Sequence, residues 1–322
     1  MAAPRRILFV RTDRLGEVLL NLPALMALRA AYPAARMTFM AAPDLCQLLS
    51  GLSGVDEWLE YQDRAGRPWW SSAARLAGQW RVRRFDLAVI SNPKKEFHAA
   101  SWLAGIKIRA GYDRKWGCLL THRLPDRKSL GQRHEVEYNL ELIRAAGADG
   151  PVPVWRMPAY EVEQAQVAQL LQGQGIQPSD PLVAVHPWSS NPRKEWPMDR
   201  FHALMARLGS SARVVVLGGP QERQRISAAW PQPAADLVGR LSLRQLAAVL
   251  KRVRLLISND SGPVHLAAAM RTPTVALFVA PDAATGPARW GPWGPGHRVI
   301  WKPAAEEITV EEVLAAATAP LA

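Results

Sequence analysis

The sequence has little cysteine and no long apolar run. Cys46 and Cys118 are the only cysteines among 322 residues, and neither belongs to a CxxC pair. Neither a disulfide framework nor a zinc site is therefore indicated, and we expect both thiols to be buried as small apolar groups. Uncharged stretches such as residues 18–28 fall well short of the roughly 20 residues that span a bilayer. Arg11 and Asp13 interrupt the first apolar run, so we expect no secretory signal and a cytoplasmic protein.

Three motifs that bind nucleotides or metals are also missing. The chain contains no GxGxxG, no GxxxxGK[ST] and no Asp-X-Asp. The first two absences argue against a nicotinamide or flavin Rossmann domain and against a P-loop. The third leaves a divalent metal on a diphosphate without its usual ligands. The negative charge of a diphosphate would then have to be neutralised by lysine, helix amino termini and hydroxyls. We therefore expect neither a metal nor another cofactor.

Positive charge is abundant, and it is unevenly divided. Residues 1–160 hold 24 Lys+Arg against 15 Asp+Glu, whereas residues 161–322 hold 16 against 13. Part of the excess lies between Lys94 and Arg133, a segment that faces either an acidic partner or solvent. The aromatic-rich modules that recognise nucleic acid are missing, so we do not expect a nucleic-acid partner.

The first half of the chain alternates predicted strands with predicted helices. The length of the whole chain, 322 residues, favours two domains. We expect strands at 6–10, 36–42, 86–91 and 108–112, and helices at 17–33 and 135–148. Such βαβ units form parallel sheets with right-handed crossovers.

A proline-rich stretch, residues 149–160, is the best candidate linker. The second half repeats the pattern, with strands at 182–187, 213–219, 255–260 and 274–280 and helices at 198–209, 241–253 and 262–270. The prediction is an α/β protein of two doubly wound, Rossmann-like domains, residues 1–155 and 156–322. A last helix at about 309–319 follows a long Pro/Gly/Trp loop and packs on one of the two domains, with a return to the N-terminal domain as one option.

The strongest local signal is "SNDSGPVHLAAAM", residues 258–270. Asp260, Ser261 and Gly262 lead from an apolar strand directly into a helix. Unpaired N–H groups at such a helix start bind phosphate. Ser261 is also a natural N-cap, and His265 would either donate to the same anion or lie buried against the sheet.

Two further loops follow predicted strands. In "WSSNPRKEWP", residues 188–197, Ser189 and Ser190 supply hydroxyls and Lys194 supplies a cation, which suits a phosphate as well as a capped, solvated loop. In "LGGPQERQ", residues 217–224, Glu222 would either bind the hydroxyls of a ribose or complement a helix dipole. Three such loops in one domain favour a nucleotide site.

Together, five motifs resemble glycosyltransferase family 9, the ADP-heptose:lipopolysaccharide heptosyltransferases. They are "RTDRLGEVLLNLPAL", "HPWSSNPRKEWPMDRF", "LGGPQE", "GRLSLRQLAAVL" and "SNDSGPVHLAAAMRTPTVALF". The resemblance runs from about Arg6 to Phe278. It implies a GT-B fold, with two Rossmann-like domains facing across a cleft, the donor held mainly by the second and the acceptor by the first.

The resemblance also assigns donor-binding roles. Ser189, Ser190 and Lys194 match the loop that holds the donor diphosphate, and Glu222 matches a residue near the ribose. Leu241 matches the position whose backbone meets adenine. The matches at the donor-binding helix start are Asp260, Ser261, Gly262 and His265, of which Asp260 meets the heptose or its phosphate.

For the first domain, the resemblance implies a single catalytic base. Family members invert the anomeric carbon without a metal, and their proposed base is an aspartate directly after a loop glycine. Here the pair is Gly16-Glu17, which makes Glu17 the candidate base and Asp13 the alternative. Alternatively, Glu17 has only a structural role, as a negative charge at a helix start that complements the helix dipole. The candidate acceptor contacts are Lys94, Lys95, His98, Arg114 and Lys115, with Arg11 and Arg14 weaker candidates.

The implied function is transfer of heptose from ADP-heptose to an acidic acceptor, the inner core of lipopolysaccharide. We expect a monomer that associates peripherally with the inner face of the inner membrane. Two alternatives stay open: a transferase using another nucleotide sugar, and a nucleotide-sugar-binding protein with weak or no transferase activity.

Overall fold

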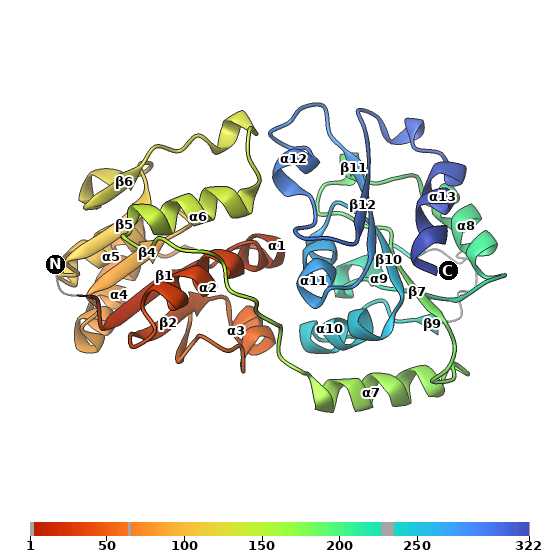
Figure 1. Cartoon of the computed structure of the whole chain (residues 1–322), viewed down its shortest axis with the longest axis horizontal. Helices are drawn as coiled ribbons and strands as arrows, with labels where there is room; N and C mark the ends of the chain where they lie inside the picture. Colours follow the sequence, from red (N-terminus) through yellow and green to blue (C-terminus); the bar gives the residue numbers. More distant parts are fainter. Residues whose placement is uncertain (1–2, 64–65, 227–234, 322) are drawn as a thin grey trace. The chain divides into compact units, whose positions relative to one another are not determined.

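A computed structural model describes residues 3–63, 66–226 and 235–321. The chain forms two compact units that divide between Pro158 and Ala159, whereas the sequence pattern placed the boundary between residues 155 and 156. Figure 1 shows the helices and strands of both units.

The first unit contains a six-stranded parallel sheet of order β3-β2-β1-β4-β5-β6. Its strands are β1 (Arg6–Val10), β2 (Arg36–Ala41), β3 (Glu57–Glu60), β4 (Leu87–Ile90), β5 (Ile108–Tyr112) and β6 (His122–Leu124). Its helices are α1 (Leu15–Leu19), α2 (Leu22–Ala31), α3 (Pro43–Leu49), α4 (Trp69–Arg83), α5 (Lys95–Leu103) and α6 (Glu135–Ala145), with short 3-10 helices η1 (Gly117–Leu119) and η2 (Lys128–Leu130).

Strand β1 is central because nearly all of its side chains are apolar. Leu8 and Val10 pack with Trp80 and Phe97 of α4 and α5 in one core cluster. Phe9, on the opposite face, stacks on Phe39 of β2 with ring centroids 5.4 Å apart. Burial on both faces is what a parallel sheet covered by helices requires.

The helix predicted at 17–33 is two helices, α1 and α2, which break at Leu20 and Asn21. Asn21 donates a side-chain hydrogen bond to the Glu17 carbonyl, 2.8 Å away. Pro23 lies in the first turn of α2, where its missing N–H is tolerated. A single continuous helix was therefore wrong, because the proline begins a new helix here.

The second unit repeats the architecture, with a six-stranded parallel sheet of order β12-β11-β10-β7-β8-β9. Its strands are β7 (Leu182–His186), β8 (Arg213–Val216), β9 (Ala235–Asp236), β10 (Leu255–Asn259), β11 (Thr274–Val279) and β12 (His297–Lys302). Its helices are α7 (Glu161–Gln172), α8 (Met198–Leu208), α9 (Pro220–Arg223), α10 (Leu243–Arg252), α11 (Gly262–Met270), α12 (Pro287–Trp290) and α13 (Val310–Leu321), with 3-10 helices η3 (Pro192–Lys194) and η4 (Ala305–Glu307). The predicted α/β class with two doubly wound units is confirmed.

One expectation near the C-terminus was wrong. The Pro/Gly/Trp loop contains α12 and the edge strand β12, in which only Ile300 is buried, so no apolar repeat in the sequence indicated this strand. The last helix packs on one of the two domains, as expected, and that domain is its own. Val313 and Ala317 of α13 lie in the core of the second unit, and α13 packs on α8 and β10.

The cysteines differ from each other. Cys46 is buried as expected, and burial raises the pKa of its thiol to about 11. Cys118 is exposed, so that expectation was wrong, because η1 belongs to a surface connection between β5 and β6. Among the described residues, no helix has both the length and the apolar character needed to cross a bilayer.

Candidate active site

The candidate base lies at the switch point of the first sheet. Strands β1 and β4 are neighbours there, and the chain runs outward from them in opposite directions. The loops after these two strands therefore meet at one edge, the usual place for a ligand in a doubly wound sheet. Asn92, after β4, donates to the Thr12 hydroxyl after β1 at 3.1 Å.

Arg11, at the end of β1, holds both candidate carboxylates. Its Nη2 lies 2.6 Å from Glu17 Oε2, and its Nε lies 2.7 Å from Asp13 Oδ1. The two carboxylate side chains are 26% and 29% exposed, whereas the Arg11 side chain is 5% exposed. Solvent and substrate can therefore reach the carboxylates but not the guanidinium. Arg11 is thus buried, unlike Arg14, the other arginine of this loop named as a candidate acceptor contact, which is exposed.

Glu17 is electrostatically unusual. Burial raises the pKa of its carboxyl, the neighbouring Asp13 raises that pKa further, and Arg11 opposes the shift. A raised pKa makes a carboxylate a better proton acceptor near neutral pH. Glu17 also lies in the first turn of α1. This position is the one that a structural role as a helix-start charge requires. Gly16 lies in the same helix and is buried.

The predicted acceptor contacts are only partly accessible. Lys95 is exposed at the start of α5, and Lys115 and Arg114 are exposed in the loop after β5. Arg114 pairs with Asp126 at 3.0 Å.

Two of the predicted acceptor side chains are engaged within the unit. Lys94 pairs with Asp63 at 2.8 Å. His98 is fully buried, and burial lowers the pKa of its imidazole. Its face of α5 turns into the unit, and an acceptor contact for His98 stays a prediction.

The second sheet has its switch point at β7 and β10, which are neighbours in the strand order. Lys194 Nζ lies 2.6 Å from Asp260 Oδ2, and Ser189 Oγ donates to the Asp260 carbonyl at 2.9 Å. Burial raises the pKa of the Asp260 carboxyl, and Lys194 opposes that shift. The structure therefore brings Ser189 and Lys194, which belong to one loop, together with Asp260, a residue far along the chain from both. Ser190, beside them in sequence, is exposed.

The start of α11 directly follows Asp260. Ser261 occupies the N-cap position but makes no side-chain cap. Instead, its Oγ lies 3.2 Å from His186 Nδ1 and 3.0 Å from Ser258 Oγ. Burial lowers the pKa of His186 to about 4, so its imidazole is neutral near pH 7. Gly262 begins the helix and His265 is buried within it.

The loop after β8 packs against the loop after β7, and the loop after β9 contacts the loop after β8, at the same end of the second sheet. A Cβ at Gly218 would lie 2.7 Å from the Trp188 ring, so glycine is needed for the loop after β8 to pack on the loop after β7. Gly239 N donates to Gly218 O at 2.9 Å, which connects the loop that carries Leu241.

The Glu222 side chain accepts from Gly219 N at 2.8 Å. In this structure it therefore caps the start of α9. Leu241 is partly exposed just before α10, as a backbone contact to a base requires.

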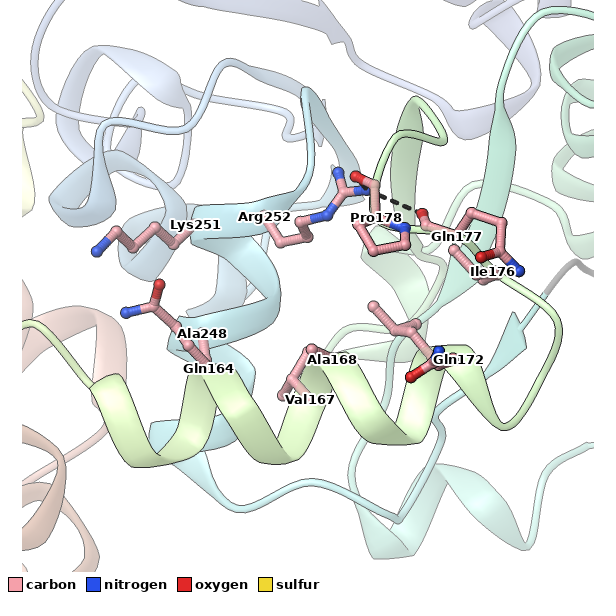
Figure 2. Close-up of a pocket in the computed structure, with 11 residues that line it drawn as sticks. Gln164, Val167, Ala168, Gln172, Ile176, Gln177, Pro178, Ala248, Lys251 and Arg252 are labelled. Carbon is pink, nitrogen blue, oxygen red and sulfur yellow. Dashed lines mark hydrogen bonds between the residues drawn. The ribbon is translucent and has the colours of Figure 1, made fainter.

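A separate cavity of about 370 Å³ lies between α7 and α10 (Figure 2). Val167, Leu171 and Ala248 form part of its apolar wall, and Lys251 lies at its edge. The predicted donor residues instead lie on the loops after β7, β8, β9 and β10.

Several polar residues around the base were not predicted. Asn21, Ser91, Lys128, Glu135 and Asn139 are all buried in the first unit. No sequence signal marked them, because Glu135 reads as an ordinary helix-start acid and Lys128 as part of a basic surface. Their burial follows from packing between distant segments.

Two doubly wound α/β units, each with polar groups at the switch point of its sheet, are the architecture of the GT-B fold. The chain belongs to glycosyltransferase family 9 (heptosyltransferase), whose family model matches residues 74–316. The lipopolysaccharide heptosyltransferase 1 of Salmonella typhimurium is 28% identical over 289 residues, which cover 85% of this chain and 88% of that protein.

Solved structures support the same fold. A family 9 glycosyl transferase from Veillonella parvula is similar with a TM-score of 0.88 at 24% identity, covering 98% of this chain and 97% of that chain. The ADP-heptose lipopolysaccharide heptosyltransferase II of Escherichia coli is similar with a TM-score of 0.79 at 23% identity, covering 98% of each chain. The predicted family and GT-B fold are confirmed.

Proposed function

We propose that this enzyme transfers heptose from ADP-heptose to an inner-core lipopolysaccharide acceptor, with inversion and without a metal. The observation that carries the proposal is Glu17, a partly exposed carboxylate held by Arg11 at the switch point of the first sheet. An inverting transfer needs one such base, and relatives named as lipopolysaccharide heptosyltransferases share the family.

In this proposal the second unit binds the donor. Lys194 and the N–H groups at the start of α11 meet the diphosphate charge, assisted by hydroxyls of the loop after β7. The Lys194–Asp260 ion pair supports this role because it holds the ammonium next to that helix start. The other donor contacts that we propose are Ser189, Ser190, Glu222 at the ribose, Leu241 at adenine, Asp260 at the heptose or its phosphate, Ser261, Gly262 and His265.

The chemical step is a single displacement at the anomeric carbon. Glu17 accepts the proton of the acceptor hydroxyl as that oxygen bonds to the anomeric carbon. The bond from this carbon to the diphosphate oxygen breaks, and ADP leaves with the electron pair. Attack from the face opposite the leaving group inverts the configuration. Lys194 and α11 stabilise the charge that develops on the diphosphate.

Glutamate in place of the family's aspartate changes the geometry more than the acidity. Unperturbed Asp and Glu pKa values differ by about 0.4 unit, but the added methylene moves the carboxylate by roughly 1 Å, which can cost about 100-fold in rate. The Arg11 contact supports Glu17 as the base because it fixes the longer side chain. Asp13 shares the same arginine and is the alternative base.

The first unit binds the acidic acceptor and the membrane surface in this proposal. Lys95, Arg114 and Lys115 are exposed there. Trp69 and Trp116 are in ring contact at 4.5 Å, and Trp70 is 62% exposed. Exposed tryptophans beside basic residues are typical of surfaces that sit on anionic lipid. We propose peripheral attachment of a monomer to the inner face of the inner membrane.

The proposal is tested by ADP release with ADP-heptose, a Kdo-containing acceptor and EDTA. We expect ADP release that depends on the acceptor, with UDP-sugars as the control donors. Tight binding of ADP-heptose by calorimetry without turnover would identify a binding protein instead. Turnover with a UDP-sugar but not with ADP-heptose would assign another donor.

A further inference from the structure

A chain of charged side chains leads from the Glu17 carboxylate into the first unit. Arg11 contacts Asp13 and Glu17 on its outer side, and its Nη1 lies 3.9 Å from Glu135 Oε1 on its inner side. Glu135 is in turn hydrogen-bonded to Lys128 Nζ. Arg11 is therefore held from both sides by carboxylates.

Neutral groups fix the same arrangement. Arg11 Nη1 donates to Ser91 O and Oγ, each at 3.2 Å. Ser91 Oγ donates to Asn21 Oδ1 at 2.6 Å, and Asn21 donates to the Glu17 carbonyl at 2.8 Å. Lys128 Nζ also donates to Asn139 Oδ1 at 3.3 Å. The backbone and the carboxylate of Glu17 thus depend on one connected network.

The exposure of the charged side chains falls from Asp13 and Glu17 at the surface to Glu135 inside the unit. Glu135 is 1% exposed and lies at the first position of α6, where the helix dipole favours an anion. Lys128 is 10% exposed in its side chain. A buried charge is costly unless it is paired, so Glu135 needs both Lys128 and Arg11.

The charges in this cluster do not cancel. Arg11 and Lys128 are cations, whereas Asp13, Glu17 and Glu135 are carboxylates, which leaves one negative charge in excess. Uptake of one proton makes the cluster neutral. Glu17 and Asp13 are the members that substrate can reach, so the excess charge favours proton uptake at the position proposed for the base.

We infer that Glu135 and Lys128 are positioning residues that anchor Arg11 and, through it, set the location and charge balance of the Glu17 carboxylate. This inference rests on the proposed function, because its catalytic consequence requires Glu17 to be the base. Neither Glu135 nor Lys128 touches substrate in this account.

Other ionisable groups that face the cluster have partners or are neutral. The Lys128 ammonium lies 4.2 Å from the centre of the Tyr112 ring, and burial raises the pKa of Tyr112 well above its usual range, so the phenol stays neutral. Asp126 pairs with Arg114, and Glu141 of α6 pairs with Arg133. The pKa of Glu17 is set by burial, Asp13 and Arg11, and Glu135 acts on Glu17 through Arg11, which both carboxylates contact.

The test compares Glu135→Gln with the double variant Glu135→Gln/Lys128→Met. The first removes one negative charge from the cluster, and the second restores the original charge balance with neutral side chains of similar size. The control is Glu141→Gln, which removes the same charge from an outer position of α6. Two readouts are used: the acid limb of kcat against pH, and direct titration of Glu17 by carbon-13 NMR, assigned with Glu17→Gln.

For Glu135→Gln we expect the Glu17 titration and the acid limb to move together to lower pH by about 0.5–1 unit, because the competing negative charge on the inner side of Arg11 is lost. The double variant returns both midpoints toward the native values. Because it lacks the Glu135 anchor, its kcat falls by about 10-fold with an unchanged donor KM. Glu141→Gln behaves like the native enzyme.

The inference is overturned if the Glu17 titration stays in place or moves to higher pH in Glu135→Gln. It is also overturned if the double variant keeps native kcat, a result that can be read even if the single variant does not fold. A Glu17 titration that shifts as expected while the acid limb stays fixed supports the network and instead contradicts Glu17 as the base.

Discussion

At the scale of single residues, the Lys194–Asp260 pair shows how an ion pair prepares a phosphate site. The Asp260 side chain is 13% exposed, and its 2.6 Å contact with Lys194 offsets the cost of burying it. The same contact keeps the lysine at the start of α11 before any donor arrives. Less side-chain entropy is then lost on binding.

Lys194→Ala is expected to weaken ADP binding. A hydrogen bond to a charged group contributes about 1.5–3 kcal/mol, so we expect the Kd to rise about 10–100-fold, measured by calorimetry. The matched control is Lys251→Ala, which removes an exposed lysine at the cavity between α7 and α10. Unchanged affinity in Lys194→Ala would contradict the diphosphate site, and weakened affinity in Lys251→Ala would move the nucleotide to that cavity.

At the scale of elements, the donor edge depends on loops that pack on one another. Trp188 is fully buried and lies against Gly218, which places the loop after β8 beside the loop after β7. No side chain larger than hydrogen fits between them. This contact keeps the donor loops in register.

Gly218→Ala is therefore expected to lower the free energy of unfolding by about 1–3 kcal/mol through overpacking, and to weaken ADP binding. Urea unfolding and calorimetry measure the two effects. Gly209→Ala is the control, because a Cβ there would make ordinary contacts of 3.5 Å at the end of α8. Equal stability of the two variants would show that the Trp188 contact is not needed.

Elements with strong local signals were predicted well. The predicted bounds of β1 and α11 match the structure, because an apolar run and a Ser-Gly-Pro helix start are visible in the sequence. Strand β12 was missed because it is an exposed edge strand. In the site, the predicted Ser189, Lys194 and Asp260 do come together. The network around Arg11 and Glu135 was not predicted, because its burial arises from contacts across about 120 residues of sequence.

At the scale of the whole molecule, two similar units carry different chemistry. Each has its candidate groups at the switch point of a parallel sheet. The first unit presents carboxylates there and the second presents a cation and a helix start. Most of the net charge of +12 lies in residues 1–160, which suits an acidic acceptor and an anionic surface.

Binding to lipid vesicles should follow from this charge division. We expect co-sedimentation with phosphatidylglycerol vesicles but not with phosphatidylcholine vesicles, and loss of binding at about 0.5 M salt because screening shortens the electrostatic range. Each basic residue near the surface contributes about 1 kcal/mol, so Lys115→Glu should bind more weakly than the control Lys251→Glu. Equal binding to both lipids would contradict the proposed surface.

The most direct test of the account is turnover by Glu17→Gln with ADP-heptose and a Kdo-containing acceptor, with donor affinity measured on the same preparation. We expect kcat to fall by about 100-fold or more, as for loss of a positioned base, while donor affinity stays near the native value. Asp13→Asn, measured alongside, should have the smaller effect. Native turnover in Glu17→Gln would contradict Glu17 as the base, and a large loss confined to Asp13→Asn would assign the base to Asp13.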